Sequence, residues 1–477
     1  MNAVLTIVML VVCAVAAIMV PDHGPTALAL CLFLASIAAV AIWRFDRANE
    51  FLVRLFIGAL AARIFVATLI AFFKWQTFFG GDSDTYDFYG WSMGLAWHGS
   101  GIYKAYVEQF TRSGGSGWGM LYVVAFIYEV VGRNTFAVQL FNAVIGAATA
   151  VIVYSIAQHL FENKRVARIA ALFVAFYPSL ILWSAQALKD GPIVFLLVVS
   201  MLCTLKMAER FSVKYLVILL ASVLSVLTLR FYIFYMLITA IAGAFVIGMR
   251  SFSAKSFTRQ FVVVIIMGLA MTYMGITRYA TRQLGAFGNL ETVQRSRQDA
   301  ATSAKSGFAA DVDVSTTGGA LSAIPIGLFY LLFAPLPWQL ASARQMITLP
   351  EMIVWWLSFP LLILGLWFTI RHRLRRVSPI LLFTTLLTLG YSVFQGNIGT
   401  AYRQRAQLLV FYFIFVAVGM VLFKERREDR KRQAEERNQM IAAKQAERGF
   451  PPFKSPRDFG VKPTFQAVTP AIPGDES

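Results

Sequence analysis

The chain has 477 residues, of which 58% are hydrophobic and only 14% are charged, with a mean hydropathy of +0.64. Soluble domains carry about 25% charged residues, so this composition excludes an ordinary soluble protein and indicates a polytopic membrane protein. The net charge of +18 does not indicate a nucleic-acid partner, because the basic residues lie in short loops between apolar runs and in the C-terminal tail. All three cysteines lie within apolar runs, which argues against a disulfide framework or a cysteine metal site.

Apolar runs recur along most of the chain, and a membrane span needs about 20 apolar residues. We therefore predict an all-α polytopic protein with about 12 transmembrane helices. The candidate runs are 4–20, 25–43, 51–73, 135–160, 167–183, 191–207, 213–229, 231–248, 260–277, 351–370, 378–395 and 406–423. Two further runs are doubtful, because 118–131 is short and contains Glu129, and 321–340 carries three prolines that break regular helix.

The distribution of Lys and Arg predicts the topology. If neither doubtful run crosses the membrane, the loops on one side hold 16 Lys and Arg, and the short connections opposite hold 4. By the positive-inside rule both termini are then cytoplasmic, and residues 74–134, 278–350 and 396–405 lie on the outer face. Run 118–131 becomes an interfacial amphipathic helix in the first large outer loop, and run 321–340 becomes a re-entrant or interfacial segment.

Two domains follow from this topology. Residues 1–423 form the transmembrane domain, with its large outer loops at 74–134 and 278–350, and residues 424–477 form a basic cytoplasmic tail. The tail begins with helix formers of both charges and becomes rich in proline after Gly449, so we expect a helix followed by a disordered end. Within the second outer loop, the polar segment 278–320 is either a mobile lid or a plain surface loop.

An acidic stretch with three carboxylates, Asp82, Asp84 and Asp87, follows the run 51–73, where a membrane span meets water. We expect it just outside the bilayer, because a carboxylate in hydrocarbon costs several kcal/mol. Asp82 and Asp84 are the candidate catalytic residues, since a partly desolvated carboxylate can accept a proton from an attacking hydroxyl. Tyr86 and Asp87 are candidate substrate-binding residues. An Asp-x-Asp spacing can also hold a divalent cation, although acidic surface loops contain the same pattern.

Lys189 and Asp190 stand at the outer start of the run 191–207. Asp190 is either an N-cap, favoured there by the helix dipole, or a second acid that faces the same pocket. In the second case Lys189 would bind phosphate.

Arg403 and Arg405 lie on the outer side against the positive-inside bias, so they require a local anion. A lipid phosphate fits, because a guanidinium pairs with phosphate oxygens bidentately, and the alternative is snorkelling to lipid headgroups. Arg230, alone between two outer span ends, is a weaker candidate of the same kind. Arg63 lies near the middle of the run 51–73 and needs a buried partner that the sequence does not identify.

Between about Arg54 and Ile193 the chain resembles the protein-mannosyltransferase-like superfamily of GT-C glycosyltransferases, which includes the aminoarabinose transferases acting on lipid A. Four stretches carry the resemblance, namely Asp82–Tyr86, Met120–Gly132, Phe161–Ala171 with Tyr177–Ser179, and Leu188–Asp190. In this resemblance Asp82 matches the catalytic Asp of the family, Asp190 its second acid, and Arg403 its C-terminal arginine near the lipid phosphate. Ser83 departs from the family, which often has Glu there, so Asp84 is the candidate for that role.

The resemblance implies an inverting hexosyl- or pentosyltransferase that uses a polyprenyl-phosphate-linked sugar donor and a lipid or glycan acceptor on the outer face of the plasma (inner) membrane. It implies no certain cofactor and leaves a divalent cation open. The topology agrees with this, because nucleotide sugars are confined to the cytoplasm and the acids face outward. Two alternatives remain: a polysaccharide polymerase or ligase using lipid-linked oligosaccharide, and a flippase or transporter of lipid-linked sugars, for which the spans show few intramembrane charges.

Overall fold

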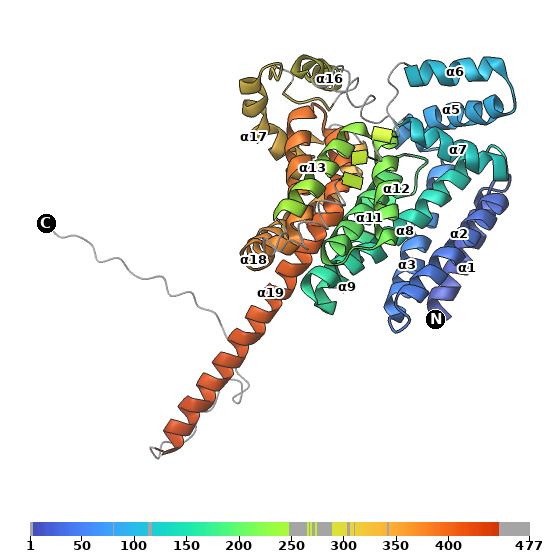
Figure 1. Cartoon of the computed structure of the whole chain (residues 1–477). Helices are drawn as coiled ribbons and strands as arrows, with labels where there is room; N and C mark the ends of the chain where they lie inside the picture. The colour runs from blue at the N-terminus through green and yellow to red at the C-terminus, as the bar shows by residue number, and fades with distance from the viewer. Residues whose placement is uncertain are drawn as a thin grey trace. The chain divides into compact units, whose positions relative to one another are not determined.

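The computed structural model describes residues 3–79, 81–112, 117–247, 265–266, 268–269, 272–273, 289–302, 306–309, 311–340 and 343–447. In these ranges the chain is helical, and the one β-bridge joins Gly307 to Asn397 (Figure 1). The predicted all-α class is therefore confirmed.

The helices run in the following order: α1 (Ala3–Met19), α2 (Gly24–Phe45), α3 (Glu50–Phe72), α4 (Gln76–Phe79), α5 (Asp82–Trp97), α6 (Gly101–Arg112), α7 (Trp118–Val131), α8 (Thr135–Phe161), α9 (Lys164–Phe176), α10 (Pro178–Ser184), α11 (Asp190–Glu209), α12 (Val213–Leu229), α13 (Phe231–Ile247), α16 (Leu290–Thr302), α17 (Thr317–Phe333), the 3-10 turn η1 (Pro337–Gln339), α18 (Ala343–Phe394) and α19 (Ile398–Glu447).

Six helices of the described chain are long and apolar enough to span a membrane, or seven if the bent pair α9–α10 forms one span. The predicted number of about 12 is thus not confirmed. One reason is length, because α1, α12 and α13 have 17 residues each and reach about 25 Å, whereas the hydrocarbon core is about 30 Å thick. A second is that α18 joins two expected spans across a break at Arg373. The expected span 260–277 lies largely outside the described residues.

The chain divides into two compact units, Met1–Val421 and Leu422–Ser477. In the second unit the described residues 422–447 are helical, with mostly exposed side chains. The part of the tail after Gly449, predicted to be disordered, lies outside the described residues. The assignment of this unit to the cytoplasm stays a prediction.

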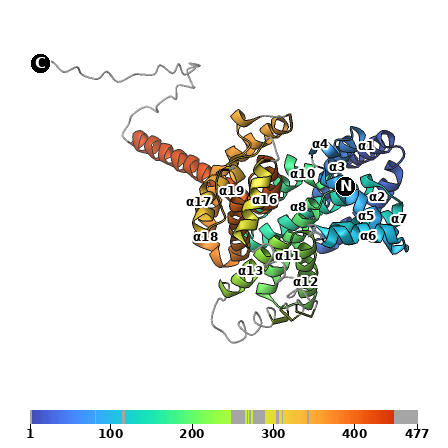
Figure 2. The ribbon, with the colours of Figure 1, turned by 90° about the horizontal axis from the view of Figure 1, so that it is seen from above.

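Helix α8 lies at the centre of the first unit, where it packs against α2, α3, α9 and α11. Figures 1 and 2 both show α8 and α11 between the N-terminal helices α1–α7 and the helices α17 and α18. Small residues let the neighbours approach closely, and a Cβ at Gly146 would meet the Ser184 side chain at 2.5 Å. The helix begins at an N-cap, since the Asn134 side chain accepts a hydrogen bond from the Ala137 amide at 3.0 Å.

The partner of the buried Arg63 is the break between α9 and α10, which are bent by 55°. Pro178 has no amide hydrogen, so the Val174 carbonyl four residues earlier loses its helical donor. Arg63 of α3 donates to this carbonyl at 3.2 Å, to the Ala175 carbonyl at 2.8 Å and to the Ser184 hydroxyl at 2.8 Å. The intramembrane arginine therefore holds the break in shape and positions the turn that follows α10.

Candidate active site

A cavity of about 1080 Å³ opens beside the start of α5. Its wall is built from the ends of several helices, and four of the predicted site residues line it: Asp82, Lys189, Arg230 and Arg403. The remaining lining residues are Val66, Phe79, Pro178, Ile181, Leu182, Trp183, Ser306, Pro335, Gln345, Ile347, Thr348, Glu351, Asn397, Ile398, Gly399, Thr400 and Tyr402. The cavity thus has both an apolar surface and a set of converging charges.

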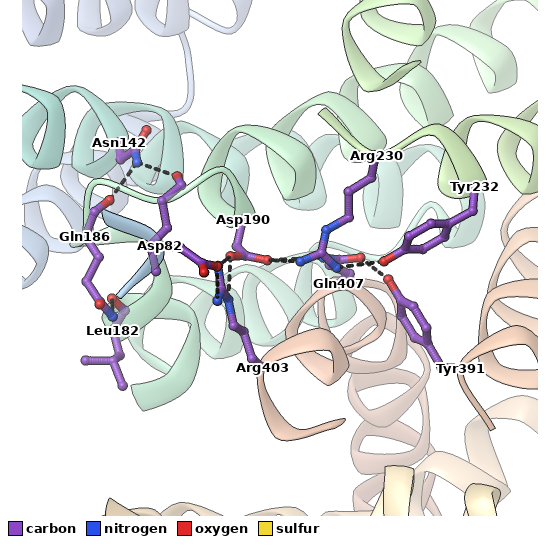
Figure 3. Close-up of polar contacts among 11 residues, drawn as sticks. Asp82, Asn142, Leu182, Gln186, Asp190, Arg230, Tyr232, Tyr391, Arg403 and Gln407 are labelled. Atoms are coloured by element: carbon purple, nitrogen blue, oxygen red, sulfur yellow. Dashed lines mark hydrogen bonds and ion pairs between the residues drawn. The ribbon is translucent and has the colours of Figure 1, made fainter. Parts of the chain in front are cut away.

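Arg403 joins the two predicted acids. Its Nη1 donates to Asp82 Oδ2 at 2.7 Å, and its Nε donates to Asp190 Oδ2 at 2.7 Å (Figure 3). Asp82 begins α5 and Asp190 begins α11, so both carboxylates lie at positive helix ends, which favour an anion. The Asp82 side chain remains 51% exposed, whereas Asp190 is only 1% exposed.

Asp190 is the buried end of a longer polar chain. Its Oδ1 accepts from Arg230 Nη2 at 3.2 Å and from Gln407 at 3.4 Å (Figure 3). Arg230 also donates to the Tyr232 hydroxyl at 3.0 Å. These bonds satisfy a carboxylate that would otherwise be very costly to bury, and they fix the direction of Arg403.

Lys189 lies next to this pair, in the turn between α10 and α11. Its Nζ lies 5.9 Å from the centre of the Tyr86 ring, which places the predicted Tyr86 in the same cluster. Burial lowers the pKa of Lys189 to about 7, and the neighbouring Arg230 adds to the effect. When Lys189 is protonated, three basic groups face the two carboxylates, and the cluster has a net positive charge that favours an anionic ligand.

The backbone around Lys189 requires two residues that sequence reasoning missed. Asn142 of α8 donates to the Gln186 carbonyl at 2.6 Å and to the Leu188 carbonyl at 2.8 Å, so it holds the turn that presents Lys189 (Figure 3). Gly117 has a φ of +95°, and a Cβ there would lie 2.8 Å from Lys189 Nζ. The sequence held a signal for Asn142, because a polar Asn within the apolar run 135–160 is uncommon in a membrane span.

Asp84 and Asp87 do not join the cluster around Arg403. Asp84 is exposed on α5. Asp87 accepts hydrogen bonds from Arg133, from the Tyr128 hydroxyl and from Thr135. Burial alone would raise the pKa of Asp87, but the bonds from Arg133 and Tyr128 outweigh burial and hold the pKa below its ordinary value. Asp87 therefore ties α5 to α7 and α8 and holds the helix that presents Asp82.

The sequence leaves the acidic stretch open as a site for a divalent cation. Arg403 pairs with Asp82, and Arg133 pairs with Asp87, so two of the three carboxylates already contact a cation. In the part of the chain that the structure describes, no three His, Cys, Asp or Glu side chains come together as a metal site.

Arg405 was expected to contact lipid phosphate together with Arg403, but it is not among the residues that line the cavity. It donates to the Leu331 carbonyl at 2.7 Å and to the Ala334 carbonyl, and it is only 2% exposed. The last carbonyls of a helix have no intrahelical donor, and Arg405 supplies it for α17. Its role in the structure is to cap α17 and fix the segment that carries Pro335 to the cavity wall.

The described part of the predicted lid 278–320 is tied to the rest of the unit. Arg297 of α16 donates to the Gln395 carbonyl at 3.2 Å and to the Ala309 carbonyl at 3.1 Å. Beside it, the Ile398 amide donates to the Ser306 carbonyl at 3.0 Å, and Ser306 lines the cavity. This segment therefore forms part of the cavity wall.

Residues 117–274 match the sequence profile of the dolichyl-phosphate-mannose-protein mannosyltransferase family. The match overlaps the predicted resemblance at residues 117–193 and confirms it there. The family is one of membrane glycosyltransferases of the GT-C type. It contains Lys189, Asp190 and Arg230, whereas Asp82 and Arg403 lie outside it. No curated protein matches the chain.

Proposed function

We propose that this protein transfers a sugar from a polyprenyl-phosphate-linked donor to a lipid or glycan acceptor at the outer face of the plasma membrane. One observation carries the proposal: Arg403 links the half-exposed Asp82 to the buried Asp190 at the wall of a cavity of about 1080 Å³. An acid open to solvent and an arginine beside it are the two groups that transfer from a lipid phosphate requires.

The cavity suits both parts of such a donor. Arg403 and Lys189 line it and offer charge to a phosphate, which a guanidinium binds bidentately. Apolar side chains offer a surface to the first prenyl units: Val66, Phe79, Pro178, Ile181, Leu182, Ile347 and Ile398. A membrane-held donor can then enter sideways from the bilayer.

The reaction is a displacement at the anomeric carbon. Asp82 accepts the proton of the acceptor hydroxyl, whose oxygen forms a bond to the anomeric carbon on the face opposite the phosphate. The bond from this carbon to the phosphate oxygen breaks, and the electron pair stays on the phosphate, where Arg403 and Lys189 stabilise the charge. The product sugar is inverted, and the polyprenyl phosphate is released.

Asp82 and the donor phosphate compete for Arg403 in this scheme. The pair at 2.7 Å places the guanidinium on Asp82, and a phosphate at the same site would draw the guanidinium away. Asp190 keeps its bonds to Arg403 and Arg230, so the arginine pivots about a fixed buried partner. The displaced Asp82 carboxylate is then free to accept the proton of the acceptor hydroxyl.

The outer-face location rests on the distribution of basic residues, with 16 Lys and Arg in the loops of one side and 4 in the short connections of the other. Asp82 follows α3 on the side with few basic residues. This topology also assigns both termini to the cytoplasm.

The test is transfer by the Asp82→Asn variant in nanodiscs. The assay measures release of undecaprenyl phosphate from a panel of undecaprenyl-phosphate sugars, with an extract of outer-leaflet lipids and glycans as acceptor. We expect release to fall by about 1000-fold or more, because the amide cannot accept the proton. Asp84→Asn is the matched control and should retain most of the activity. Wild-type activity in Asp82→Asn would overturn the proposal.

A further inference from the structure

The cavity has a second carboxylate that the proposed mechanism does not use. Glu351 of α18 lines the cavity wall and is only 5% exposed. Its Oε2 accepts a hydrogen bond from the Tyr402 hydroxyl at 2.8 Å. Tyr402 directly precedes Arg403 on α19, so two neighbouring residues of one helix reach the two acidic parts of the cavity.

Neighbouring contacts fix the position of Glu351. One turn further along α18, the Trp355 indole nitrogen donates to the Leu332 carbonyl at 2.7 Å. The Tyr177 hydroxyl donates to the Glu351 backbone carbonyl at 3.4 Å. An ionisable group at this place in an apolar helix is costly, and such groups usually bind a ligand or a partner.

The surroundings of Glu351 differ from those of Asp82. Neutral side chains that can form hydrogen bonds line the cavity just before Glu351 in the chain and around Tyr402. They are Gln345, Thr348, Asn397, Thr400 and Tyr402 itself. The buried Arg405 lies close enough to interact electrostatically with Glu351, but its hydrogen-bond donors are directed to backbone carbonyls and to Met352. The Glu351 part of the cavity therefore offers acceptors to a neutral ligand that carries hydroxyl groups.

Trp183 lines the cavity near both of these parts. Its ring centre is 5.7 Å from the Arg403 guanidinium carbon and 6.3 Å from the centre of the Tyr402 ring. One aromatic ring is thus near both the arginine that faces Asp82 and the tyrosine that faces Glu351. Its apolar face suits the carbon side of a sugar ring, while the polar groups near it suit a phosphate and hydroxyls.

We propose that Glu351 and Tyr402 bind the sugar of the donor through its hydroxyl groups and so determine which sugar the protein accepts. The inference rests on the proposed function, because it takes the Arg403 end as the phosphate site. Charge sets the orientation, since Arg403 and Lys189 attract the donor phosphate at one end and the Glu351 carboxylate accepts hydrogen bonds from hydroxyls at the other. A site built to bond a hydroxyl discriminates strongly against a sugar that lacks it, because the carboxylate is then left unpaired.

Two probes separate the sugar site from the phosphate site. One is farnesyl phosphate, which has no sugar, and the other is a set of farnesyl-phosphate sugars carrying mannose, glucose, galactose or 4-aminoarabinose. Affinities are measured by calorimetry on the full chain in nanodiscs. For the sugar conjugate that the wild type binds best, we expect Glu351→Gln to weaken binding by about 10- to 100-fold, with the affinity for farnesyl phosphate unchanged.

Two variants support this comparison. Glu162→Gln is the matched control, because Glu162 is exposed and pairs with Arg376 away from the cavity, and we expect it to bind both probes as the wild type does. Tyr402→Phe leaves Glu351 without its hydroxyl partner and should change the order of preference among the four sugars. A thermal unfolding scan checks that each variant is folded.

The outcomes are distinguishable. If the wild type binds farnesyl phosphate and its conjugates but a folded Glu351→Gln variant weakens no conjugate, the role of Glu351 is overturned and the proposed function stands. If no farnesyl-phosphate sugar binds more tightly than farnesyl phosphate, the role of Glu351 is likewise overturned and the proposed function stands. If the wild type binds neither probe, the proposed function itself fails.

Discussion

Arg403 and Arg405 are two residues apart on α19 and have opposite surroundings. Arg403 contacts two carboxylates at the cavity wall, whereas Arg405 contacts backbone carbonyls at the end of α17. An arginine between acids stays exchangeable, because a phosphate can replace one of them, but an arginine that caps carbonyls has no such substitute. The two arginines have the same sequence signal but different contacts, and we propose that Arg403 acts in the reaction and that Arg405 stabilises the fold.

Arg403→Gln should have the largest effect, and the effect should be on activity. The variant removes the group that stabilises the leaving phosphate, so we expect transfer to fall by about 1000-fold, equivalent to about 4 kcal/mol in the barrier. Thermal unfolding in nanodiscs should change little in comparison, because Asp190 keeps its bond to Arg230. Transfer within tenfold of the wild type would show that the two arginines do not differ as described.

Arg405→Met should act on stability instead. The change leaves the Leu331 and Ala334 carbonyls without donors in a buried place, which we expect to lower the free energy of unfolding by about 3 kcal/mol. Denaturant unfolding in detergent measures the loss. The fraction that remains folded should still release undecaprenyl phosphate within about tenfold of the wild-type rate, and a stable but inactive variant would contradict the assignment.

Lys189 should make a smaller, pH-dependent contribution to donor binding. With a pKa of about 7 in the free protein, it is cationic below this pH and neutral above it. A bound phosphate stabilises the cation and raises the pKa of Lys189 in the complex, so affinity should fall as pH rises through 7. The other charged groups of the cluster are Asp82, Asp190, Arg230 and Arg403.

A farnesyl-phosphate sugar is the suitable probe for this dependence, because its phosphodiester does not titrate in this range. We expect the affinity to fall by about tenfold between pH 6 and pH 9, as one charge contact is lost. Lys189→Gln should remove this slope, and Lys104→Gln, outside the cavity lining, should keep it. An unchanged slope in Lys189→Gln would assign the titration to another group.

The sequence allowed the all-α class and much of the charged cluster to be predicted. Asp82, Asp190 and Arg403 stand at ends of apolar runs, where a charge is costly unless it has a purpose, and the structure brings all three together. The number of spans was harder to predict from the sequence. Helices of 17 residues are as apolar as full spans, and hydropathy does not show that two expected spans join in one broken helix, α18.

Contacts made across the fold could not be predicted. The sequence gives no sign that Arg405 meets the end of α17 or that Asp87 meets Arg133, because these partners are far apart in the chain. Glu351 stood at the first position of an expected span and was counted as part of it. Its role depends on the side of α18 that faces the cavity, which hydropathy alone does not show.

The central claim is that Asp82 and a donor phosphate compete for Arg403, and one paired measurement on Asp82→Asn tests it most directly. The affinity for farnesyl phosphate and the rate of undecaprenyl phosphate release are measured on the same nanodisc sample. We predict that the affinity is retained or increases by up to about tenfold, since Arg403 has lost its competing carboxylate, while release falls by about 1000-fold. A folded variant that loses affinity for farnesyl phosphate, or that releases undecaprenyl phosphate at the wild-type rate, would contradict the claim.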